Sequence, residues 1–145
     1  MKNATKILSA VLILLLLFNV YQLIKCSTSP YDQNSIDQNY KVEIGRISGG
    51  IEDVNDIDYT GYLLAIEHAS KASALSQLTS YHKKSPDTTS RVSEINVMLR
   101  DLHNNKKAPK NKEELLNLIQ KFSSDPTDQK ILNEIFVLLQ ESLNS

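Results

Sequence analysis

The chain has a single cysteine among its 145 residues, and this scarcity excludes several kinds of chemistry. One cysteine cannot form an internal disulfide, so an oxidising compartment would permit only an intermolecular bridge or a free thiol. Cys26 also lies directly after an apolar N-terminal segment, away from any histidine with which it could form a catalytic pair. The fold therefore has to be stabilised without a disulfide.

Other residues that carry chemistry are scarce or poorly spaced. The three histidines, His68, His82 and His103, include no pair at the i, i+4 spacing that suits a metal ion. The glycines form no phosphate-binding loop, and no serine lies in a nucleophile-elbow context. Basic residues are not interleaved with aromatic ones, as nucleic-acid recognition would favour. We therefore predict a protein that is not an enzyme, carries no cofactor and does not bind nucleic acid.

The N-terminal segment has the pattern of a membrane-inserted helix. Lys2 and Lys6 precede an unbroken apolar run over residues 10–18, and no acidic residue lies within or before it. Residues 7–24 would extend for roughly 27 Å as a helix, close to the thickness of the hydrocarbon core of a bilayer. We predict that residues 7–25 form a transmembrane signal anchor.

Charge predicts the orientation of this anchor. The amino group and two lysines lie on its N-terminal side, whereas Lys25 stands alone at its other end. Because basic flanks stay in the cytoplasm, residues 1–6 are expected to be a cytoplasmic n-region. The sequence thus predicts a single-pass protein of the cell membrane with its C-terminal domain outside.

Three alternatives for the N-terminal segment remain open. In a cleaved signal peptide, residues 14–17 would be the apolar h-region and Ser27 with Ser29 the small residues before the cut, and the chain would be secreted. In a lipoprotein, Cys26 would carry the lipid, although Lys25 occupies a position where a small residue is usual. The segment could also be a buried or peripheral hydrophobic helix.

Residues 26–58 are expected to form a polar, acidic linker. They are rich in serine, aspartate, asparagine and glutamine, and their few apolar residues cannot bury much surface. Within them, Val42 and Ile44 alternate with charged residues, which indicates a short strand over residues 40–47.

Charge is unevenly distributed along the chain. Residues 29–70 contain two basic and eight acidic residues, a net charge of −6, whereas residues 71–112 contain nine basic and three acidic residues, a net charge of +6. Residues 113–145 contain two basic and six acidic residues, a net charge of −4. These regions could neutralise one another on folding or steer different partners.

From Tyr59 onward, apolar residues recur every three or four positions, which predicts helices. We expect an extracytoplasmic helical domain over residues 59–145. Its helices are expected at residues 59–82, after Ser85, after Asn111 and after Asp125.

Capping signals support these helix starts. Ser85 and Asp125 each precede a proline, as is typical of an N-cap followed by the first helical position, and Asn111 with Glu114 resembles a capping box. The fourth helix is the most apolar and is expected to be the most buried. The predicted fold class is all-α: an N-terminal transmembrane or signal helix, a polar linker, and a small bundle of three to four short helices.

The sharpest motif lies where the expected linker meets the first of these helices. Asp56, Asp58, Thr60, Gly61 and Glu67 match positions 1, 3, 5, 6 and 12 of an EF-hand calcium loop, which needs oxygens at alternate positions, a glycine turn and a final bidentate carboxylate. The four oxygen-bearing residues are candidate calcium ligands. Alternatively, the first three cap the helix that follows.

A cluster of lysines forms the second candidate site. Lys106, Lys107, Lys110 and Lys112 lie in one loop, and outside the cytoplasm they could contact anionic lipid headgroups or cell-wall polymers. A solvated loop is the simpler interpretation of these lysines.

Taken together, these patterns predict a small membrane-anchored extracytoplasmic helical protein, plausibly bacterial from its lysine-rich composition. We expect it to act by protein–protein interaction, in a regulatory, immunity or assembly role in the cell envelope. Its partners would be the membrane, through residues 7–25, and a protein, through the helical domain. Self-association is expected to contribute because the domain is small. The alternative is a secreted or lipid-anchored module that binds calcium or another ligand.

Overall fold

The computed structural model describes residues 13–22, 32–55 and 57–145. The chain divides into two compact units, Met1–Asp32 and Gln33–Ser145, and each is considered by itself. In the first unit, residues 13–22 are helical with exposed side chains. Among the described residues, no helix combines the length and the apolar character needed to cross a membrane. Much of the expected anchor over 7–25, the n-region over 1–6 and Cys26 lie outside the described residues.

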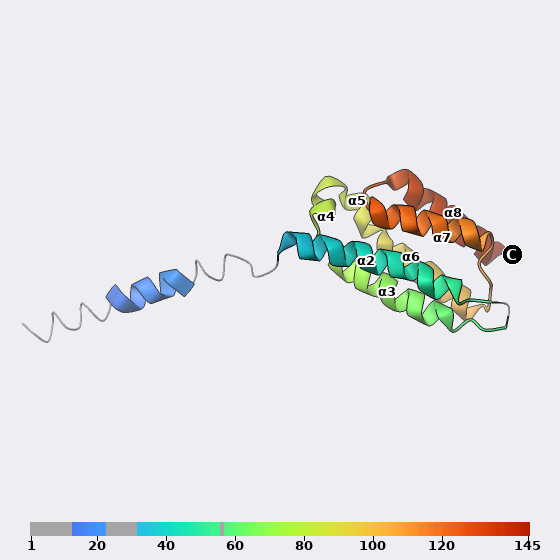
Figure 1. The fold of residues 1–145 in the computed structure, drawn as a ribbon, viewed down its shortest axis with the longest axis horizontal. Helices are drawn as coiled ribbons and strands as arrows, with labels where there is room; N and C mark the ends of the chain where they lie inside the picture. Colours follow the sequence, from blue (N-terminus) through green and yellow to red (C-terminus); the bar gives the residue numbers. More distant parts are fainter. Residues whose placement is uncertain (1–12, 23–31, 56) are drawn as a thin grey trace, which may run out of the picture. The chain divides into compact units, whose positions relative to one another are not determined.

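The second unit consists of helices, and no strand occurs among its described residues (Figure 1). This confirms the prediction of an all-α fold with a helical bundle, whereas the expected number of three to four helices is too low. The helices are α2 (Gln33–Glu52), α3 (Gly61–Ser76), α4 (Ser80–Lys84), α5 (Pro86–Ser90), α6 (Val92–Asn104), α7 (Lys112–Ser124) and α8 (Gln129–Asn144).

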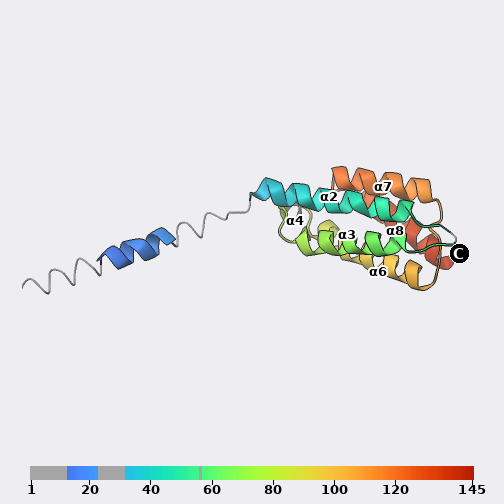
Figure 2. The ribbon, with the colours of Figure 1, turned by 60° about the horizontal axis from the view of Figure 1, so that its bottom comes forward.

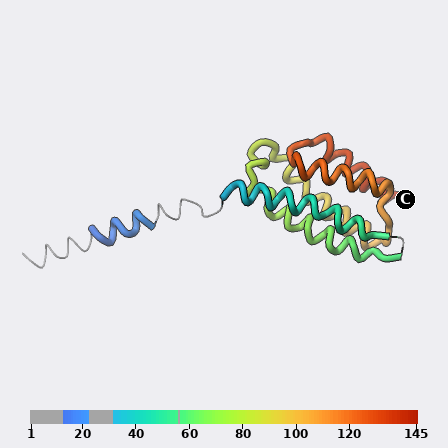
Figure 3. Tube along the Cα trace, in the orientation of Figure 1, coloured from blue at the N-terminus to red at the C-terminus, as the bar shows by residue number. Residues whose placement is uncertain are grey.

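The five longer helices surround one hydrophobic core. Helix α2 packs between α3 and α7, α3 packs against α6, and α8 closes the arrangement by contacting both α6 and α7 (Figure 2). The short helices α4 and α5 lie at one end of the bundle (Figure 3). Every long helix supplies large side chains that are fully buried, including Tyr40, Ile47, Tyr62, Leu99, Phe122 and Leu132.

Helix α2 corrects the prediction for the segment before residue 59. The expected linker over 26–58 is wrong for Gln33–Glu52, and the expected strand over 40–47 is wrong as well. Tyr40, Ile44, Ile47 and Ile51 are all buried in the core. They recur at steps of four, three and four, which places them on one face of a helix. The many polar residues between them lie on the solvated faces and conceal this stripe.

The expected first helix, over residues 59–82, ends earlier than predicted. Helix α3 stops at Ser76, and a new start follows because Thr79 adopts an extended conformation and its hydroxyl accepts a hydrogen bond from His82 N at 3.1 Å. Asp37 of α2 accepts a second hydrogen bond from the first residue of α4, Ser80 N, at 2.8 Å. These side-chain caps separate α4 from α3.

None of the three expected N-cap residues caps its helix through its side chain. Ser85 occupies the N-cap position of α5 but makes no cap bond. Asn111 has a left-handed conformation with φ of 51° and no side-chain cap bond, because a capping box needs an extended N-cap residue. The last helix is capped by Asp128, which accepts from Lys130 N and Ile131 N, and Asp125 accepts from Thr127 instead. Pro86 does occupy the predicted first turn of a helix, α5.

Candidate functional site

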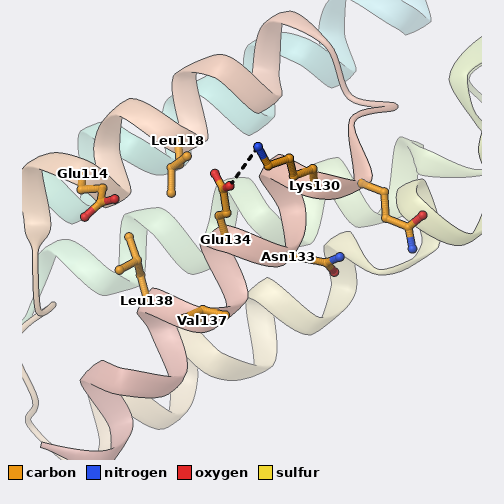
Figure 4. Close-up of a pocket in the computed structure, with 8 residues that line it drawn as sticks. Glu114, Leu118, Lys130, Asn133, Glu134, Val137 and Leu138 are labelled. Atoms are coloured by element: carbon orange, nitrogen blue, oxygen red, sulfur yellow. Dashed lines mark ion pairs between the residues drawn. The ribbon is translucent and has the colours of Figure 1, made fainter.

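Helix α8 is less buried than its apolar composition predicts. Five of its 16 residues are buried, against seven of 16 in α3, so the expectation that α8 is the most buried helix is wrong. Residues 125–128 connect α7 to α8, and the two helices form an antiparallel hairpin (Figure 4). A groove lies along the outer side of this hairpin.

The groove has a volume of about 520 Å³ and is mostly apolar at its floor. In Figure 4, Leu118 of α7 and Leu138 of α8 point toward each other across it, and Val137 lies beside Leu138. The remaining lining residues are polar and come from both helices: Glu114, Gln129, Lys130, Asn133 and Glu134. The chemistry of the lining suits an apolar side chain that arrives with polar neighbours.

At the floor of the groove, two buried core side chains keep a small exposure beside an exposed valine. Leu118 and Leu138 keep exposed fractions of 6% and 7%, whereas every other buried hydrophobic side chain in the described residues is exposed by 2% or less. Val137 is exposed by 56%. Covering these three side chains would remove apolar surface from water, and that removal is the main favourable term in protein association.

The spacing of the lining residues follows the ridges of two helices. Glu114 and Leu118 are separated by one turn on α7, and Lys130, Glu134 and Leu138 are separated by successive turns on α8. From the first to the last of the α8 residues the groove extends about 12 Å, the rise of eight residues or slightly more than two helical turns. Ridges of this kind accept the side chains of a third helix.

The walls of the groove carry carboxylates on both sides. Glu114 lies in the first turn of α7, where the helix dipole favours it. Glu134 lies on α8 and forms an ion pair with Lys130 at 3.9 Å, with side-chain exposures of 47% and 86%. A solvent-exposed pair at this distance contributes little and is easily exchanged for another partner. The groove is therefore apolar at its centre and acidic at its edges.

One wall of the groove is fixed from outside the hairpin. Arg91, at the start of α6, donates a hydrogen bond from Nη1 to Asn133 Oδ1 at 2.9 Å. The same guanidinium lies 4.5 Å from the centre of the Phe136 ring, a cation–π contact. These contacts hold α8 against α6, so the groove is preformed on a supported helix.

A second group of titratable residues lies between α2 and α3. His68 Nδ1 lies 2.7 Å from Glu43 Oε2, and Arg46 Nη1 donates to Glu43 Oε1 at 3.3 Å. Beside the cluster, Gln120 of α7 donates to Gly45 O at 3.2 Å. The polar groups thus satisfy one another across the helix contacts, and we assign them to holding α2 against its neighbours.

The predicted calcium ligands are only partly placed by the structure. Asp56 lies outside the described residues. Thr60 N donates to Asp58 Oδ1 at 2.8 Å, and this contact lowers the pKa of Asp58. Glu67 pairs instead with Lys71 at 2.6 Å, and the hydrogen bond lowers its pKa. Gly61 is the first residue of α3 and has no positive φ, so it does not form the sharp turn of an EF-hand loop.

The rest of the described chain offers no metal site either. Within residues 13–22, 32–55 and 57–145, no three side chains of His, Cys, Asp or Glu converge on a point that could hold a metal ion. The calcium hypothesis stays a prediction because its first ligand, Asp56, is outside these ranges.

Two of the four clustered lysines serve the fold. Lys112 Nζ donates to Val54 O at 2.8 Å and to Glu52 O, which caps the end of α2, and Lys107 Nζ donates to Leu143 O near the end of α8. Lys106 and Lys110 are exposed. Cationic side chains at helix C-termini satisfy carbonyls that lack a helical partner. The cluster therefore presents fewer lysines to solvent than its sequence indicates.

Sequence reasoning missed the groove. Val137 follows Glu134 by three positions and precedes Glu141 by four, so it lies on the polar face of α8. Val97 has the same spacing from Glu94 and Asp101 on α6, outside the groove, so this pattern alone does not locate the groove. No protein-family model matches the chain, and no curated protein or solved structure is significantly similar to it.

Proposed function

We propose that the protein is a small membrane-anchored, extracytoplasmic helical protein that acts by binding another protein in the cell envelope. Its role would be in regulation, immunity or assembly, without catalysis. The observation that carries this proposal is the groove between α7 and α8, where core side chains of Leu118 and Leu138 reach the surface beside exposed Val137. Such an apolar surface with polar edges is typical of protein-binding sites.

The proposed location rests on the sequence of the N-terminal segment. Two lysines precede an apolar stretch, and the residues after it carry acidic side chains. This pattern supports an anchor over residues 7–25 with the helical bundle outside the cytoplasm. Cell fractionation with the intact mass of the mature chain tests it: full-length protein in the membrane, digested by protease added outside, is expected. A shorter chain released to the medium would contradict the anchor.

The binding function is tested in cells by a site-specific cross-linker. A photoreactive amino acid is placed at position 137 of the full-length chain, and a matched variant carries it at position 97. Val97 is exposed by 58%, close to the 56% of Val137, and lies on α6 outside the groove. A discrete cross-linked product is expected from position 137 alone. Equal products from both positions, or none from either, would contradict protein binding at the groove.

A further inference from the structure

From the shape and charge of the groove we infer the class of segment that it binds: an amphipathic helix whose apolar stripe is flanked by lysine or arginine residues. This inference rests on the proposed function and adds the chemistry of the partner. It is drawn from three properties of the α7–α8 hairpin, namely its ridges, its floor and the charges on its walls.

The ridges indicate a helical occupant. Both walls are helices, and their lining residues recur at one-turn intervals over about 12 Å. A third helix can lie along the hairpin and place its side chains between these ridges. The apolar contact it needs spans about two turns, so residues at i, i+3 or i+4, and i+7 of the partner would meet the floor.

The floor indicates which side chains the partner inserts. Leu118 and Leu138 form its bottom, and Val137 forms part of its side. Nothing on this floor is charged, and its branched aliphatic groups suit leucine, isoleucine, methionine or phenylalanine. A buried polar side chain of the partner would lose its hydration without gaining a hydrogen bond here.

The charges on the walls indicate basic flanks. Glu114 projects from α7 and Glu134 from α8, so a carboxylate lies on each side of the apolar floor. A smaller hollow adjoins the α7 end and adds Glu113. The base that lines the groove, Lys130, is highly exposed and already lies beside Glu134.

A neighbouring base does not offset these carboxylates. Lys112, next to Glu113, directs its ammonium group to the carbonyls of Glu52 and Val54 instead. The region from 113 to 145 also has two basic and six acidic residues. A helix with lysine or arginine on both edges of its apolar stripe complements this pattern, whereas an acidic helix is repelled.

The inference is tested with two synthetic helices that differ only in charge. One peptide has a leucine stripe flanked by lysines, and the other has the same stripe flanked by glutamates, each about 14 residues, or four turns, long. Both carry one photoreactive leucine. They are titrated against the full-length chain in phosphatidylcholine nanodiscs, and cross-linked residues are mapped by mass spectrometry, so that lipid binding is not counted. The lysine peptide is expected to cross-link to α7 and α8, and the glutamate peptide is not.

Variants of the chain make the test specific for the groove. Val137→Asp is expected to weaken binding of the lysine peptide by about tenfold or more, because it places a charge beside the apolar floor. Val97→Asp, the matched surface change on α6, is expected to leave binding unchanged. Glu114→Lys combined with Glu134→Lys is expected to reverse the preference toward the glutamate peptide. Circular dichroism melting of each variant confirms that it is folded.

The outcomes separate the inference from the proposed function. Preference of the unmodified chain for the glutamate peptide, or equal effects of Val137→Asp and Val97→Asp, would overturn the inferred partner class. If the in-cell cross-link from position 137 is nevertheless specific, protein binding stands and only the class of segment is wrong. If that product has twice the mass of the chain, the occupant is a second copy, which also overturns the inference.

Discussion

Gly50 of α2 and Gly61 of α3 face each other where the backbones of the two helices are in close contact. A methyl group on Gly50 would lie 2.8 Å from Gly61 O and would overlap with Ala65 N, and one on Gly61 would overlap with Gly50 O. Neither glycine has a positive φ. Both are therefore required for the close approach of two backbones rather than for a turn.

This relationship predicts opposite effects of alanine at neighbouring glycines. Gly50→Ala is expected to lower the free energy of unfolding by about 1–3 kcal/mol, because the added carbon forces the helices apart. Gly49→Ala is the control: this exposed residue has no atom within 4 Å of an added methyl group. Alanine there is expected to stabilise α2 by about 0.5–1 kcal/mol. Urea unfolding monitored by circular dichroism measures both, and equal effects would contradict the tight contact.

The lysines of the loop before α7 are predicted to differ in their effect on stability. Lys112→Gln is expected to lower the free energy of unfolding by about 1–2 kcal/mol, because it removes the charged donor from the carbonyls at the end of α2. Lys110→Gln is expected to change it by less than about 0.5 kcal/mol, since that side chain is exposed. Thermal melts of the two variants check this, and equal losses would contradict the capping role of Lys112.

The contact between Asp37 and Ser80 predicts a dependence of stability on pH. Partial burial acts to raise the pKa of Asp37, but hydrogen bonds from the Ser80 hydroxyl and backbone N–H and from Gln33 outweigh it, so the pKa lies below its ordinary value of 3.8. A carboxylate with a lowered pKa stabilises the fold above its unfolded pKa, and this contribution is lost as the pH falls through the folded pKa.

Asp37→Asn is accordingly expected to cost about 1 kcal/mol at neutral pH, as the loss of a helix cap does. Its stability is then expected to fall less steeply than that of the unmodified chain between about pH 5 and pH 2. Asp101→Asn, a change at an exposed residue of α6, provides the control. Denaturant titrations across this pH range provide the measurement. Parallel pH profiles for the unmodified chain and Asp37→Asn would rule out the assignment.

Two glutamates that pair with basic residues of α3 are predicted to contribute unequally to stability. Glu43→Gln is expected to lower the free energy of unfolding by about 1–2 kcal/mol, because its partner His68 is nearly buried and loses a charged acceptor. Glu67→Gln removes only an exposed pair with Lys71, whose side chains are 57% and 50% exposed, and is expected to change stability by less than about 0.5 kcal/mol. Chemical denaturation separates the two, and a larger loss from Glu67→Gln would refute this ranking.

Helical periodicity predicted the second half of the fold well, and α7 and α8 lie where their apolar stripes indicated. The same rule applied to Tyr40, Ile44, Ile47 and Ile51 would have found α2. The polar composition of residues 26–58 indicated a linker instead, because the exposed faces of a helix can be as polar as a linker. The glycines near residue 50 gave no sign of the helix, because their use in close packing depends on a partner helix that composition does not reveal.

The groove could not be predicted in the same way. Leu118 and Leu138 have the spacing of ordinary core residues, and only the arrangement of α7 and α8 leaves a small part of each exposed in the groove. Local sequence determines which face of a helix is apolar, but the distance between two helices depends on every side chain packed between them.

The position of α2 between α3 and α7 also constrains the order in which the bundle can assemble. Lys112 caps the C-terminal end of α2 by bonding to Glu52, 60 positions away in the sequence, and to Val54, 58 positions away. The contacts at this end of α2 are therefore among the most non-local in the unit. A chain delivered from its N-terminus would leave the side of α2 that packs against α7 uncovered until α7 emerged, although α3 could already cover the other side. Forming contacts between segments so far apart in the sequence slows folding and prolongs the lifetime of aggregation-prone intermediates. The newly made chain would therefore be most vulnerable to aggregation and proteolysis before residue 124 is released.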